Sequence, residues 1–306
     1  MKPDSSSEGR LLFPGTTFVL GKGGVGKTVI SEGLASLSKQ AGHETLLVRL
    51  GESLLPPADR SFAPSPSAHG FHVVDLDPRT AMDEYVRHVV RVRALSDRII
   101  ASDVYAKFFA AAPGLPELVI LGRIREYTRE KDGEGTARFR SIVVDCPSSG
   151  HALLMLETPF AAFRAASIGP FGRLASGVTT WLGSETRLVV VAIPEEMAVV
   201  EAIEFQRDLR DRTGLGISLA ILNRLRTEPI STETRRAVAD RGGRAPALAL
   251  ADDWLLECGA RVLRRNRLEA FHQRRIARGL ALQPVKVAEL DHPRPRQTAE
   301  ALLAGA

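Results

Sequence analysis

The stretch Gly21-Lys22-Gly23-Gly24-Val25-Gly26-Lys27-Thr28 decides the fold of this chain. It follows an apolar run at residues 17–20, which predicts a buried strand, and precedes residues 29–40, whose apolar spacing predicts a helix. A glycine-rich loop between a strand and a helix is the context that a phosphate-binding loop requires. The glycines let backbone N–H groups approach a polyphosphate, and the helix N-terminus favours its negative charge.

The residues of this loop have expected roles in binding a nucleotide. We expect Lys27 to neutralise the outer phosphates and the Thr28 hydroxyl to ligate Mg²⁺. The competing interpretation is a glycine-rich turn that binds nothing, and the complete eight-residue match disfavours it. The predicted nucleotide-contacting residues are Gly21, Gly23, Gly24, Val25, Gly26, Lys27, Thr28 and Val29.

Length and composition indicate one large cytoplasmic domain. The 306 residues fit a single α/β domain over 11–306, preceded by a polar tail at 1–10 that we expect to be disordered. The tail lacks the apolar segment of a secretory signal, and no apolar run is long enough to span a bilayer. Any membrane contact is therefore expected to be peripheral. Cys146 and Cys258 lie far apart, which argues against a disulfide framework or a zinc site and favours a reducing compartment.

The net charge of +5 raises the question of a nucleic-acid partner. Only seven of the 41 basic residues are lysines, so the arginine excess runs through the whole chain. The densest arginine run, residues 261–278, is interspersed with apolar residues at helical spacing, which predicts an amphipathic helix with a solvated face. We therefore expect no nucleic-acid partner.

Short apolar strands alternate with helices along the chain. The helices are predicted at residues 81–100, 198–213 and 231–240, and the strands at 44–50, 71–76, 141–144, 188–193 and 217–222. This alternation predicts a doubly wound, mostly parallel sheet whose ligand lies at the carboxyl ends of the strands. Residues 100–127 and 152–185 form a candidate helical layer for a cargo or partner. Asp145, at the carboxyl end of a strand, is placed to hold the water shell of Mg²⁺, the alternatives being a helix cap or a surface carboxylate.

Several segments resemble the arsenite-pump ATPase family, which also contains ATPases that target tail-anchored membrane proteins. They include residues 73–85 with Asp77-Pro78, the switch-like segment 145–153, residues 193–202 with Pro194-Glu195-Glu196, and Leu222-Asn223-Arg224. The resemblance implies a P-loop fold with an inserted helical layer, ATP or ADP with Mg²⁺, and a dimer of identical chains or of paralogues. With a lysine at its second position, Lys22, the loop resembles the deviant form of the phosphate-binding loop. In that form this lysine reaches the nucleotide bound by the partner protomer. The resemblance also implies an adenine contact for Asn223 and a place beside the base for Pro284.

Two departures from the family pattern bear on function. The aspartate that the family uses to activate water after its second strand is missing, and Glu52 is the candidate substitute, so hydrolysis is expected to be slow. The alternative is a regulatory subunit that binds nucleotide and pairs with an active paralogue. The lack of a cysteine cluster argues against arsenite as cargo, and the chain also has only four methionines and no cysteine pair, unlike the family members that target tail-anchored proteins. Residues 160–182 would either offer an apolar groove to a client helix or form core.

Overall fold

One eight-stranded sheet organises the part of the chain that the structure describes. The computed structural model describes residues 7–50, 63–90, 92–105, 107, 114–165, 168–226, 232, 236 and 250–306. The order of the strands is β3-β4-β2-β5-β1-β6-β7-β8, and every neighbouring pair is parallel except β3 and β4. The strands are β1 (Gly15–Leu20), β2 (Thr45–Leu50), β3 (Ser65–Pro66), β4 (His72–Leu76), β5 (Ser141–Asp145), β6 (Thr186–Ala192), β7 (Leu219–Leu225) and β8 (Val285–Ala288). The predicted doubly wound, mostly parallel sheet is confirmed.

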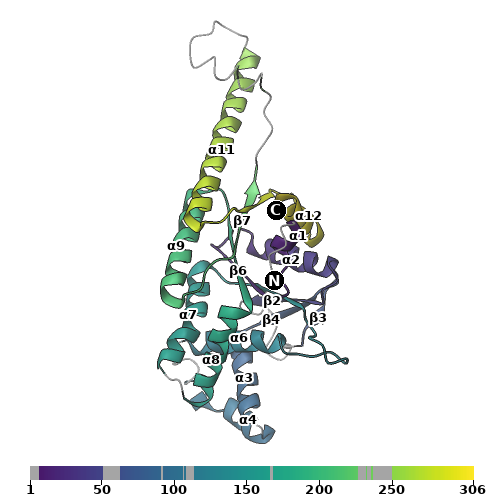
Figure 1. Ribbon diagram of the computed structural model, residues 1–306, viewed down its shortest axis with the longest axis vertical. Coiled ribbons are helices and arrows are strands. Elements are labelled where there is room, and N and C mark those ends of the chain that lie inside the picture. The colour runs from purple at the N-terminus through teal and green to yellow at the C-terminus, as the bar shows by residue number, and fades with distance from the viewer. Residues whose placement is uncertain are drawn as a thin grey trace.

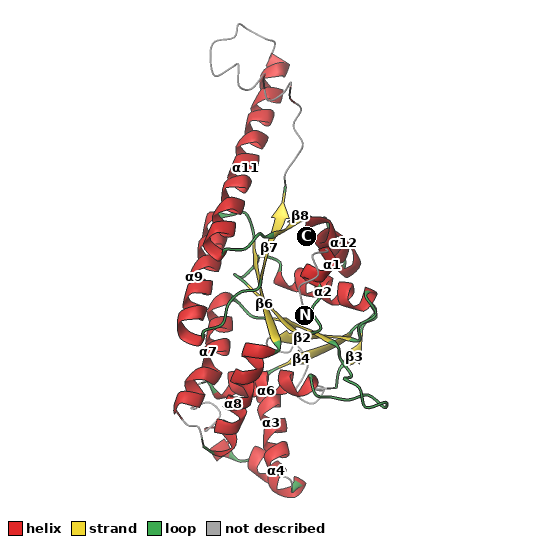
Figure 2. Ribbon diagram, viewed as in Figure 1, coloured by secondary structure: helices red, strands yellow, loops and turns green. Residues whose placement is uncertain are grey.

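Helices cover both faces of the sheet (Figures 1 and 2). Their bounds are α1 (Ser7–Leu11), α2 (Lys27–Gln40), α3 (Pro78–Val89), α4 (Arg93–Ile100), α6 (Leu115–Tyr127), α7 (Ser149–Ala165), α8 (Gly169–Ser184), α9 (Glu196–Thr213), α11 (Leu250–Leu280) and α12 (Pro295–Gly305). Successive residues of a strand point to opposite faces, so neighbours in β1 join different cores. Val19 packs with α2 and α12, whereas Phe18 packs with Trp181 of α8 at a ring-centroid distance of 5.8 Å.

Helix α12 packs on α2, the helix that follows the glycine-rich loop. The contact is close because Gly33 has no side chain: a Cβ there would lie 2.5 Å from Cγ2 of Thr298 and 3.2 Å from Cδ1 of Leu302. Both α12 residues are buried, as is Leu34 of α2 beside them. The last helix of the chain is therefore seated directly on the helix that begins at Lys27.

The ends of the molecule differ in character. Helices α3, α4, α6 and α8 gather at the lower end in Figure 1, while α11 extends upward beyond the sheet. An α-helix of 31 residues is roughly 46 Å long. Its lower part lies beside α9, where Ile276 and Leu280 are buried.

Several sequence-based boundaries are revised by the structure. Residues 7–10 of the predicted tail belong to α1, and the Arg10 guanidinium donates to the carbonyls of Gln283 and Ala306. The helix predicted at 81–100 is two helices, α3 and α4, and β8 and α12 were not predicted. The helix predicted at 231–240 lies outside the described residues, apart from Thr232 and Arg236, which are helical.

Candidate functional site

The glycine-rich loop connects β1 to α2 and depends on left-handed backbone at three positions. Gly21, Gly24 and Gly26 have φ values of 147°, 84° and 92°, which glycine adopts at little cost. A Cβ on Gly21 would lie 2.3 Å from the carbonyl oxygen of Val191, so this glycine also allows the loop to pass close to β6. Gly26 is the N-cap of α2, and the loop therefore ends where the helix presents its first free N–H groups.

Lys27 is folded back over this loop. Its ammonium group donates to the carbonyl oxygens of Gly21 at 3.0 Å and Lys22 at 3.1 Å. Burial lowers the pKa of Lys27, and the nearby carboxylate of Asp145 opposes that shift. A partly desolvated cation beside a glycine-rich loop and a helix N-terminus is suited to receive phosphate oxygens.

Asp145 and Thr28 meet at the foot of the loop. The Thr28 hydroxyl donates to Oδ2 of Asp145 at 2.7 Å, and the Ser31 hydroxyl donates to Oδ1 at 3.4 Å. Burial raises the pKa of Asp145, while the hydrogen bond from Thr28 and the charge of Lys27 partly offset the rise. Parallel pairing of β1 with β5, in which Val19 lies opposite Asp145, brings the carboxylate to this place. A hydroxyl and a carboxylate together are the oxygen ligands that Mg²⁺ prefers.

Ser31 was not identified from the sequence. It lies one helical turn after Thr28, and the i, i+3 spacing places both hydroxyls on one face of α2. The spacing of the two hydroxyls, together with an acid at the end of a nearby strand, could have identified Ser31 from the sequence.

Lys22 lies beside an acid of its own protomer. Its ammonium group is 3.5 Å from Oε2 of Glu201 on α9, and the two side chains are 39% and 34% exposed. The Ser149 hydroxyl at the start of α7 donates to the other carboxylate oxygen of Glu201. Glu201 therefore links Lys22 to the segment that follows Asp145. Neither Glu201 nor Ser149 was singled out as a site residue from the sequence.

Asn223 braces the loop from the neighbouring strand β7. Its side-chain NH₂ donates to the carbonyl oxygen of Val25 at 2.9 Å, and Asn223 is only 6% exposed. A Cβ on Gly26 would lie 2.4 Å from the same nitrogen, so the absence of a side chain there makes room for the brace. The amide oxygen of Asn223 is not used in this hydrogen bond.

A cavity of 210 Å³ opens beside Asn223. It is lined by Gly26, Val29, Asn223, Arg224, Val287, Ala288, Glu289, Leu290, Pro293 and Thr298. Its walls come from the end of the loop, the end of β7 and the chain between β8 and α12. Pro284 is not among these residues: it precedes Val285 at the amino end of β8, whereas the cavity lies at the carboxyl ends of the parallel strands. Pro293 is the proline beside this cavity.

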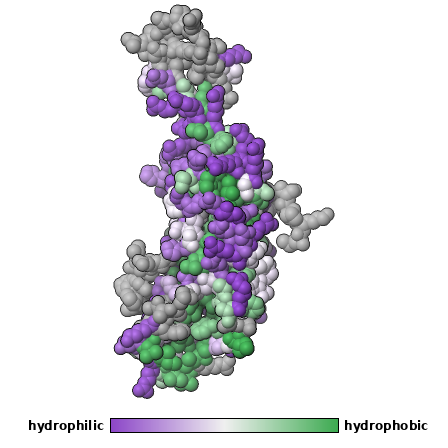
Figure 3. All heavy atoms as spheres, turned by 90° about the vertical axis from the view of Figure 1, so that its left-hand side faces the viewer, coloured by the Kyte–Doolittle hydropathy of each residue, from purple (hydrophilic) through white to green (hydrophobic). Residues whose placement is uncertain are grey.

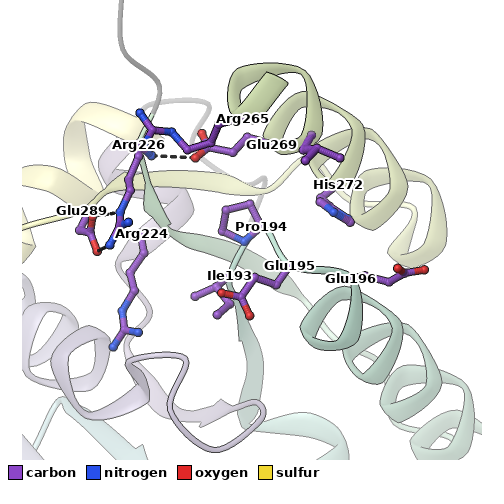
Figure 4. Close-up of a pocket in the computed structure, with 11 residues that line it drawn as sticks. Ile193, Pro194, Glu195, Glu196, Arg224, Arg226, Arg265, Glu269, His272 and Glu289 are labelled. Atoms are coloured by element: carbon purple, nitrogen blue, oxygen red, sulfur yellow. Dashed lines mark hydrogen bonds and ion pairs between the residues drawn. The ribbon is translucent and has the colours of Figure 1, made fainter. Parts of the chain in front are cut away.

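A second cavity of 420 Å³ adjoins the first and shares Arg224 and Glu289 with it (Figure 4). Arg226 forms an ion pair with Glu289, and its backbone N–H donates to Glu269 at 3.1 Å. The Arg224 guanidinium points away from that pair (Figure 4). The remaining lining residues come from the chain before α9 and from α11, namely Ile193, Pro194, Glu195, Glu196, Arg265, Leu268 and His272.

The carboxyl end of β2 carries an arginine. Arg49 lies opposite Asp145 in the register of β2 and β5, and its Nε is 3.2 Å from Oδ1 of Asp75 on β4. Glu52, the candidate substitute for the missing aspartate, lies outside the residues that the structure describes. Within the described part of the chain, no group of three or more His, Cys, Asp and Glu residues is arranged to hold a metal ion.

The chain is similar in sequence to known ATPases, and its family match covers the segment that contains the glycine-rich loop. Residues 15–164 match the family described as anion-transporting ATPase. The chain is 26% identical over 209 residues to an arsenical pump-driving ATPase of Escherichia coli, covering 66% of this chain and 33% of that protein. It is 28% identical over 219 residues to ATPase BagA of Mycobacterium tuberculosis, covering 67% and 64%. The match to a putative arsenical pump-driving ATPase of Halobacterium salinarum is 26% over 247 residues, covering 72% and 37%.

The chain thus spans between about a third and two thirds of the length of these relatives. Among the helices of the described residues, none has the length and apolar character needed to cross a bilayer.

Proposed function

Residues 15–164 belong to the anion-transporting ATPase family, and from that premise we propose that the chain binds ATP with Mg²⁺ and hydrolyses it to ADP. The observation that carries the proposal is the 2.7 Å hydrogen bond between Thr28 and Asp145 directly beneath the glycine-rich loop. It joins, at one place, a hydroxyl that would ligate the metal and a carboxylate that would hold its water shell.

The residues of the site divide the work of binding and phosphoryl transfer. Lys27 exchanges its two loop carbonyls for phosphate oxygens when nucleotide enters, and the N–H groups at the start of α2 hold the remaining oxygens. Thr28 and Asp145 would hold Mg²⁺, which supplies charge neutralisation when bound. The cavity of 210 Å³ would receive the base, with the free amide oxygen of Asn223 able to accept from an amino group such as that of adenine.

We propose further that two protomers close around the nucleotide and that hydrolysis lets them open. Lys22 supports this proposal because it lies at the second position of the loop and is more than a third exposed. In the single protomer it pairs with Glu201, so closure requires Lys22 to leave that acid and reach the partner's nucleotide. The loss is small, since an exposed ion pair contributes about 0–1 kcal/mol.

A catalytically weak regulatory subunit is the second candidate. One observation favours it: the described end of β2 places a cation, Arg49, opposite Asp145 and paired with Asp75, and contributes no acid that could activate water. Positioning and charge neutralisation supply most of the catalysis of phosphoryl transfer, so the remaining site would support slow turnover. In the regulatory alternative, the chain binds nucleotide and an active paralogue completes the pair.

An apolar groove at the lower end of the molecule is the proposed client site. The groove measures 480 Å³ and is lined by Met82, Tyr85, Val86, Val89, Val90, Ile99, Ser102, Val104, Tyr105, Pro170 and Phe171. Apolar side chains gather at this end of the molecule (Figure 3). The groove would accept an apolar helix of a protein client. Of the segment 160–182 proposed from the sequence, Pro170 and Phe171 line it, whereas Val178 and Trp181 are buried in the core.

A steady-state ATPase assay on the pure protein tests the function. We expect slow, Mg²⁺-dependent turnover that is lost in Lys27→Ala, with Lys39→Ala as the control because Lys39 ends the same helix and pairs with Glu44. Nucleotide binding without turnover, followed by turnover after mixing with a co-encoded homologue, would establish the regulatory alternative. Unchanged binding and turnover in Lys27→Ala would rule out both.

A further inference from the structure

Helix α11 carries a positively charged outer face that the nucleotide site does not use. From residue 257 to residue 280 the sequence has seven arginines and two glutamates. Glu269 is buried and accepts a hydrogen bond from Arg226, and Arg275 pairs with Glu196 at 3.3 Å. The arginine face is defined here as the exposed residues Arg261, Arg264, Arg267, Arg274 and Arg278 together with Leu268 and Phe271.

These seven positions lie on one side of the helix. At 100° per residue they fall within an arc of roughly 140° that is centred close to Phe271. Ile276 and Leu280, which are buried, lie on the other side, and the buried His272 borders the face next to Arg261. The face is also accessible, because all seven of its side chains are exposed and the upper part of α11 extends beyond the sheet (Figure 1).

The charge on this face is strongly one-sided: the exposed Glu257, four residues before Arg261 on the same side of α11, is a single acid against five arginines. None of its five arginines forms an ion pair with an acid in the described part of the chain. Arg261, Arg264 and Arg267 follow each other at spacings of three, and Arg274 and Arg278 are separated by four, so like charges adjoin along the helix and repel. Such a face is unfavourable for the isolated chain, and an anionic partner would remove that cost.

Two apolar side chains in the middle of the face indicate what kind of anionic partner fits. Phe271, near the centre of the face, is 50% exposed, and Leu268, which also lines the rim of the 420 Å³ cavity, is 58% exposed; both are flanked by arginines. The phosphates of a nucleic acid would bind the arginines but would leave the two apolar side chains without a partner. An anionic lipid surface would bind both kinds of side chain: the arginines contact the headgroups, and leucine and phenylalanine enter the boundary between headgroups and acyl chains. We propose that the arginine face of α11 docks the protein on an anionic lipid bilayer.

Vesicle flotation of the full chain tests this proposal. We expect binding to vesicles that mix phosphatidylcholine with phosphatidylglycerol, weakened by added salt, and none to phosphatidylcholine alone. The variant Arg264→Gln/Arg267→Gln/Arg274→Gln should bind roughly 100-fold more weakly, since each arginine near such a surface contributes about fivefold. Phe271→Ser should weaken binding at every salt concentration and leave the salt dependence unchanged.

The control variant Arg93→Gln/Arg98→Gln/Arg296→Gln removes the same net charge from exposed positions on α4 and α12. It should bind the anionic vesicles as the wild type does, and the melting temperatures should show that both triple variants are folded. Equal losses in the two triple variants would overturn the proposal, as would equal binding to neutral and anionic vesicles. Failure to bind vesicles, combined with salt-dependent binding to a short DNA duplex through the same arginines, would assign the face to nucleic acid instead.

Discussion

Replacing Asn223 with alanine separates two roles for this residue: bracing the loop and contacting the base. The side chain donates a buried hydrogen bond to the Val25 carbonyl at 2.9 Å, and Val25 is 1% exposed. Asn223→Ala leaves that carbonyl without its partner, which costs about 1–3 kcal/mol. Because each kcal/mol shifts the melting temperature by about 2–4 °C in a chain somewhat smaller than this one, we expect a fall of roughly 2–12 °C without nucleotide.

The assay is thermal unfolding followed by circular dichroism, with and without ATP. Asn223→Asp provides the sharper comparison: an ionised carboxylate cannot donate to the Val25 carbonyl and would be placed against its oxygen, so this variant should melt lower than Asn223→Ala. If both variants unfold at the wild-type temperature without ATP and differ only in ATP affinity, Asn223 contacts the base and does not brace the loop. That result would refute the reasoning.

Three further predictions concern the same site. Asp145→Asn should lose roughly 100-fold or more in turnover. Burial raises the pKa of Asp145 above its unfolded value, so the ionised carboxylate destabilises the fold at neutral pH. Without nucleotide the variant should therefore melt higher than the wild type there, and the gap should close as pH falls toward that pKa; a variant that melts lower would contradict the reasoning. Glu201→Gln removes the acid that Lys22 must leave on closure, so it should strengthen ATP-dependent dimerisation up to about fivefold, as measured by sedimentation velocity. In a Lys22→Ala background the effect of Glu201→Gln should vanish. If it persists, Glu201 does not act through Lys22. Gly26→Ala should destabilise the protein by about 1–3 kcal/mol, because φ is 92° there, while Gly23→Ala, with open space around it, should be neutral in the same melts.

The parallel sheet could be predicted from the sequence because most of its strands are continuous apolar runs. Residues such as 17–20 and 188–193 are buried on both faces of a parallel sheet, and this gives an unambiguous pattern. The short strand β8 was missed because Val285–Ala288 has only two buried residues, Val285 and Val287. The break between α3 and α4 was missed because the apolar spacing continues across it.

The candidate site was predictable where local sequence fixes the geometry, and not where distant segments meet. The loop and Asp145 could be located because a strand end specifies each position. Glu201 and Ser31 could not be located in this way. The contact of Glu201 with Lys22 depends on the direction that α9 takes after β6, and the contact of Ser31 with Asp145 depends on the register between neighbouring strands. The role of Asn223 was only partly anticipated: its described hydrogen bond is to Val25 of the loop.

The absence of a side chain at Gly33 couples the position of α12 to the shape of the cavity beside Asn223. Thr298 both fills the space over Gly33 and lines the cavity beside Asn223, so the depth at which α12 sits sets the width of that cavity. A methyl group at position 33 would lift α12 and widen the cavity without altering any residue of the phosphate-binding loop. If the cavity receives the base, as proposed, a change at the contact between α2 and α12 would alter which base fits and leave the residues proposed for phosphate and metal unchanged.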